Sequence, residues 1–207
     1  MIIKTQIDDF GKPISTIFPV DLINLDYCEG LDYRGFSKLS TIEALIIRQK
    51  EALLANPLSV SFPYFLVLLT HNIPSHEGDP EAKKKYLKFL TRDIGIFETA
   101  LREQAQTSLN WYLSEECPPA YQHKCFVMGK LFDFAQSNGF KAMPKRITQY
   151  LGDKNALMLH YQFQIIPINL HSPVPVYNKM NVIDILNYPV QDEQGNNIVS
   201  DQPFIHL

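Results

Sequence analysis

The amino-acid sequence predicts an α/β domain whose mixed sheet has two parallel strands and a closing antiparallel hairpin, with long helices packed on it. Short apolar runs alternate with stretches of helical apolar spacing, and two later segments alternate around a turn. Hydrophobic residues make up 45% of the chain, which is enough for a core. The 207 residues fit one domain, expected over 1–170, with a Pro-rich C-terminal tail over 171–207 packed on it.

The first half of the chain contains two buried strands, and a helix separates them. Residues 19–27 begin with a proline, continue as a short run rich in branched apolar residues and end in polar residues. This pattern predicts a buried strand. Ser40 and Glu43 have the spacing of a capping box, so a helix is expected over 41–55. A charge-free apolar run over 62–69 predicts the second strand.

Two further helices are expected before the sheet closes. The longer one covers 80–113, because a cap, a proline and an acid open it and apolar residues recur at three- and four-residue spacing. Pro118 and Pro119 open the next helix, and Asn138 and Gly139 close it, since glycine typically follows the last helical residue. Segments 144–151 and 156–167 flank a turn and predict an antiparallel hairpin.

Composition excludes several classes of protein. The net charge of −3 gives no sign of the basic face that nucleic-acid binders present. No apolar run reaches the roughly 18–20 residues that a membrane-spanning helix needs. Three cysteines cannot all pair within one chain, so a reducing cytoplasm is expected. Only 9 glycines are present, and glycine-rich loops that hold nucleotides consume this residue.

The order strand, helix, strand, helix, helix, strand, strand resembles the C-terminal half of a class I S-adenosylmethionine-dependent methyltransferase. The resemblance covers about residues 18–168 and includes one local motif, Asn-Leu-Asp-Tyr-Cys-Glu-Gly, over 24–30. In that family an acidic or amide residue and an aromatic residue often end the fourth strand, beside the methyl donor. Asp26 and Tyr27 look like that pair. The resemblance implies a partial Rossmann-like, three-layer sandwich.

The front of the sequence departs from the family. Only about 19 residues precede the strand that would be the fourth, and Gly11 is the only glycine among them. Each strand–helix unit needs roughly 20 residues or more. The resemblance therefore implies a truncated protein or a split subunit that needs a protein partner to bind S-adenosylmethionine. A homo-oligomer is the other expected assembly.

The expected site lies where the two parallel strands end, because open α/β sheets bind ligands at that edge. Asp26 would orient an amine, Tyr27 would pack on a ring, and His71 would act as acid or base. These three are the candidate catalytic residues. The methyl donor is expected to contact Asn24, Asp26, Cys28 and Gly30, and the substrate to contact Tyr27 and Asn72.

Plainer interpretations stand beside these. Polar residues also end buried strands because the chain reaches water there. Cys28 would act as a nucleophile only with a base such as His71 nearby. Cys117, His123 and Cys125 match no common zinc spacing, so no metal is expected. The alternative function is a non-catalytic α/β interaction subunit of a larger complex.

Overall fold

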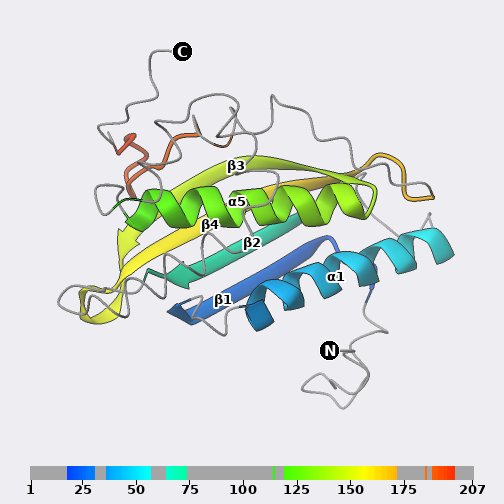
Figure 1. The fold of residues 1–207 in the computed structure, drawn as a ribbon, viewed down its shortest axis with the longest axis horizontal. Coiled ribbons are helices and arrows are strands. Elements are labelled where there is room, and N and C mark those ends of the chain that lie inside the picture. The colour runs from blue at the N-terminus through cyan, green and yellow to red at the C-terminus, as the bar shows by residue number, and fades with distance from the viewer. Residues whose placement is uncertain are drawn as a thin grey trace.

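The structure, a computed structural model, describes residues 18–30, 36–56, 64–73, 114, 119–171, 185 and 188–198 (Figure 1). In chain order its elements are β1 (Leu22–Gly30), α1 (Phe36–Ala55), β2 (Phe65–Asn72), α5 (Pro119–Ser137), β3 (Phe140–Leu151), the short helix η2 (Asp153–Asn155) and β4 (Leu157–Pro167).

The four strands form one mixed sheet in the order β1-β2-β4-β3. β1 and β2 are parallel, and β4 is antiparallel to both β2 and β3. The prediction of two parallel strands plus a closing antiparallel hairpin in an α/β fold is therefore confirmed. A parallel pair needs a crossover connection, whereas the hairpin needs only the short turn around η2.

The two helices α1 and α5 lie on the same face of the sheet (Figure 1). On α5, the Phe132 ring meets the Phe163 ring of β4 edge to face, with centroids 6.4 Å apart. On α1, the Lys38 ammonium lies 5.2 Å from the ring centroid of Tyr27 on β1. Burial of apolar side chains between these layers drives the fold. The largest fully buried side chains are Tyr161, Phe65, Lys124, Phe140, Phe163, Ile42, Ile46 and Leu69.

The opposite face of the sheet, called here the polar face, carries a different set of side chains. Successive strand residues point to opposite faces, so the register assigns each one to a side. In the row Asp26, Thr70, His160 and Thr148, each residue is the ladder partner of the next. The same alternation places further polar residues on this face, namely Asn24, Asn72, Gln162, Gln164, Arg146, Lys141 and Tyr150.

Part of the C-terminal tail covers the outer edge of β3. The Gln149 N–H donates to the Gln191 carbonyl at 2.8 Å, and the Gln191 N–H donates to the Ile147 carbonyl at 2.9 Å. Lys124 of α5 donates from Nζ to the Tyr188 carbonyl at 3.0 Å. Within the described residues, one edge of the sheet is thus closed, whereas β1 is last in the strand order.

Several expected boundaries differ from the structure. α1 begins at Phe36, so Ser40 lies inside the helix and the predicted capping box is wrong. β1 runs to Gly30, beyond the end predicted at residue 27, and β3 begins at Phe140, before the start predicted at residue 144. The helix expected over 80–113 lies outside the described residues. No helix in the described segments is both long and apolar enough to cross a membrane.

Candidate functional site

The residues expected to form a site come from the carboxyl ends of β1 and β2, which are neighbours in the sheet. Tyr27 is the ladder partner of His71, and Gly30 is the partner of Asn72, with a shift of register between Tyr27 and Gly30. Asp26 is the partner of Thr70. Because the two strands are parallel, their ends meet at one edge, as the sequence predicted for these positions.

The pleat of the sheet divides this cluster between the two faces. Tyr27 and His71 lie on the face that α1 and α5 cover, whereas Asp26, Asn24 and Asn72 lie on the polar face. Asp26 and Asn24 are exposed there. The expected residues therefore do not form a single cluster. They form two half-sites at the same end of the sheet, one on the helix-covered face and one on the polar face.

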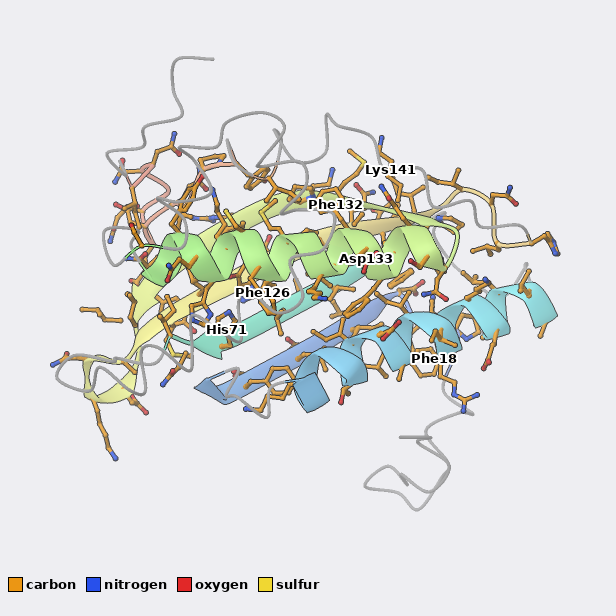
Figure 2. All side chains as sticks on the ribbon, in the orientation of Figure 1. Phe18, His71, Phe126, Phe132, Asp133 and Lys141 are labelled. Atoms are coloured by element: carbon orange, nitrogen blue, oxygen red, sulfur yellow. The ribbon has the colours of Figure 1, made fainter. Side chains whose placement is uncertain are left out.

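His71 is fully buried between the end of β2 and α5 (Figure 2). Its Nδ1 lies 2.9 Å from the Asn72 carbonyl oxygen and its Nε2 lies 3.4 Å from the Tyr161 hydroxyl. A carbonyl oxygen only accepts, so Nδ1 carries the proton and Nε2 can accept from Tyr161. The His71 ring also lies near two other rings, with centroids 5.1 Å from His123 and 5.6 Å from Tyr161.

Burial lowers the pKa of His71 to about 4. Desolvation of the charged form is the main cause and the positive charge of Lys38 adds to it, while the hydrogen bond to Asn72 opposes it. His71 is therefore neutral at pH 7. Its ring nitrogens serve neighbouring protein groups, which suits a residue that positions the Asn72 backbone.

Tyr27 is half-buried, and burial raises the pKa of its hydroxyl, so the phenol stays protonated at neutral pH. The Lys38 ammonium lies over its ring, in the geometry of a cation–π contact. Lys38 therefore covers one face of the Tyr27 ring, the ring that the sequence analysis expected to pack on a substrate.

Residues missed at the sequence level complete the half-site on the polar face. Thr70 Oγ1 lies 2.8 Å from Nδ1 of His160, and His160 Nε2 lies 3.3 Å from Nε2 of Gln162. The pKa of His160 is lowered by burial and by the charge of Arg146, although the Asp26 carboxylate acts in the opposite direction. Alternation along 156–167 was the available signal, but only the strand order brings His160 beside Thr70.

The amide oxygen Oδ1 of Asn72 is a hydrogen-bond acceptor that is buried on this side and has no hydrogen-bond partner. Buried acceptors in native proteins nearly always have a donor, so this atom is a place where a ligand N–H or O–H group fits. Gly30 is the ladder partner of Asn72, and Cys28 belongs to the same end of β1.

The cysteine and histidine residues considered for a metal give no such site in the described part of the chain, where no group of three or more potential ligands gathers. Burial raises the pKa of the free Cys125 thiol to about 11, so it stays protonated and unreactive at neutral pH. His123 packs beside His71. Cys117 lies outside the described residues.

Comparison of the chain with protein-family models, with curated proteins and with solved structures gives no match.

Proposed function

We propose that this chain is the substrate-side part of a methyltransferase-like protein, in which S-adenosylmethionine binds once a glycine-rich strand–loop–helix unit joins the sheet at β1. The position of β1 carries this proposal. It is last in the order of the described strands, it is parallel to β2, and Asp26 is exposed near its carboxyl end. A further parallel strand at β1 would bring its glycine-rich loop beside Asp26, because such loops follow the carboxyl ends of strands.

The architecture is compatible with this assignment. A parallel pair and a closing hairpin in one sheet agree with the element order on which the resemblance of residues 18–168 rests. The added unit would also supply a helix over the polar face and so complete a three-layer, Rossmann-like sandwich. The proposal holds whether that unit belongs to the same polypeptide or to a partner subunit.

The contrast between the two sheet edges supports a joining site at β1. Unpaired edge strands readily take up another strand, and proteins usually protect them. The β3 edge has such protection, because the segment around Gln191 pairs with it. No described segment pairs with the outer side of β1.

The residues near the end of β1 fit the hydrogen-bond donors of an amine or a sugar. The Asp26 carboxylate and the unpartnered Asn72 Oδ1 are both acceptors on the polar face. S-adenosylmethionine, when bound, supplies an activated methyl group. In our proposal Asp26 orients an amine, Tyr27 offers the ring face that Lys38 does not cover, and neutral His71 holds Asn72 in place.

Isothermal titration calorimetry tests the proposal. We expect no binding of S-adenosylmethionine to the chain alone and saturable binding to the chain assembled with its glycine-rich unit. Asp26→Asn should weaken binding of the donor or the amine substrate about tenfold, since charged hydrogen bonds contribute roughly 1.5–3 kcal/mol. Asp153→Asn removes the same charge from an exposed position in η2 and should have no effect. Absence of binding in the assembled protein would contradict the catalytic proposal.

The same edge favours a second candidate, a non-catalytic interaction subunit that docks through β1. Size-exclusion chromatography with light scattering separates the two. A stable complex that binds no S-adenosylmethionine would support the interaction subunit, whereas a chain that remains monomeric with every candidate partner would count against both proposals.

We place this function in the cytoplasm. Three cysteines are an odd number, and Cys125 is a buried free thiol. Free thiols of this kind fit a reducing compartment.

A further inference from the structure

A β-bulge in β3 turns Arg146 onto the polar face. Pro144 is the ladder partner of Phe163, and Arg146 is the partner of the next residue, Gln162, so Lys145 is the extra residue between them. In a regular ladder Arg146 would have faced Tyr161 in the core. Bulges are frequent beside binding sites, where they redirect a side chain.

The redirected guanidinium has a donor without an acceptor. Nε of Arg146 is buried and makes no hydrogen bond. A guanidinium is charged at every accessible pH, and a buried charged donor that lacks an acceptor is more costly than a neutral one. The Nε–H group of Arg146 therefore needs a hydrogen-bond acceptor, and no described protein group provides one.

Three polar groups of the described structure lie near Arg146, from β4, from β3 and from the C-terminal tail. Gln162 lies opposite, and Thr148 follows on the same face of β3. On the tail side, a Cβ added to Gly195 would lie 3.8 Å from Arg146 Nη2, so the turn at Gly195 passes close to the guanidinium.

Among the described residues no carboxylate forms an ion pair with Arg146, so its charge is available to a ligand. Asp192 accepts from the Asn196 backbone N–H at 2.8 Å and from the Asn196 amide at 2.9 Å, so the turn itself engages that carboxylate. Asp26 stands at the far end of its row on the polar face, with Thr70 and His160 between it and β3.

We propose that Arg146, together with Gln162, Thr148 and the turn at Gly195, binds a small oxyanion, either a carboxylate or a phosphate group. A guanidinium presents parallel N–H donors that match two oxygens of one anion, which favours such groups over a halide. This site is on the hairpin and the tail, so it is independent of the joining edge at β1.

Nuclear magnetic resonance of the arginine Nε–H groups gives the direct test in the full chain. Sodium phosphate, sodium acetate and sodium chloride are titrated at matched ionic strength, and the Arg146 signal is assigned by its loss in Arg146→Lys. We expect a saturable shift of this signal with phosphate, with acetate, or with both, and the effective anion identifies the class of ligand. Equal shifts with chloride, or no shift with either oxyanion, would overturn the proposal.

Calorimetry with the same anions provides the second measurement. Arg146→Lys keeps the positive charge but loses the paired donors, so affinity should fall about tenfold. Lys141→Gln removes an exposed charge near the start of β3 (Figure 2) and should leave affinity unchanged. If Arg146→Lys binds as tightly as the natural chain, a general ionic effect explains the result and the site does not exist.

Discussion

Lowering the pH from 6.5 to about 4 should remove roughly 3 kcal/mol of folding stability through His71 alone. The pKa of His71 is about 4 in the folded protein and near 6.5 in the unfolded chain. Between pH 6.5 and 4, the His71 imidazole is therefore protonated in the unfolded chain and neutral in the folded chain. The contribution is fully present above pH 6.5 and is lost as the pH falls towards 4, at about 1.4 kcal/mol for each unit.

Urea unfolding at a series of pH values measures this effect, and His71→Gln removes it. Glutamine does not titrate, but its amide can still donate and accept hydrogen bonds. The pH slope of its unfolding free energy should be shallower than that of the natural chain, whatever its absolute stability. His160→Gln is the matched control, because His160 is partly exposed and should contribute less to the slope. Equal slopes for the natural chain and His71→Gln would contradict the prediction.

Local patterns in the sequence were sufficient to predict most of the described elements. The charge-free run of β2 and the alternation in β4 reflect burial on one or both faces of a sheet, which sequence periodicity records directly. The start of α1 differs from the predicted capping box, and its first turn contains a contact between strand and helix that sequence spacing does not show, Lys38 over the Tyr27 ring of β1. Tertiary packing of this kind overrides local capping preferences.

The candidate site was predictable only in part, for reasons of topology. That β1 and β2 end together follows from their parallel pairing. Asp26 and Tyr27, however, are adjacent in a strand and so point to opposite faces. The residues that complete the polar face, His160 and Arg146, come from the hairpin. A bulge after Pro144 decides the side on which Arg146 lies, and proline inside a strand is compatible with a bulge or an edge strand without fixing which residue is the extra one.

The second large effect is expected at Gly139, where α5 ends and β3 begins. Its φ of +81° lies in the left-handed region, and a Cβ there would overlap the Asn169 carbonyl oxygen and lie 2.7 Å from the carbonyl carbon. The segment cannot retreat freely, because the Ile168 and Asn169 N–H groups donate to the Gly139 carbonyl at 2.9 and 3.0 Å. Left-handed strain of about 1–2 kcal/mol and overpacking of about 1–3 kcal/mol predict that Gly139→Ala destabilises the protein by roughly 2–5 kcal/mol.

Gly129 in the middle of α5 is the internal control, since a Cβ there meets no atom within 4 Å. Alanine has the higher helix propensity, so Gly129→Ala should stabilise the protein by about 0.5–1 kcal/mol. Denaturant unfolding of the two variants should thus give changes of opposite sign for the same added methyl group. Equal changes would mean that the loop at Asn169 yields to the new side chain, and that the helix end does not depend on the absence of a Cβ at Gly139.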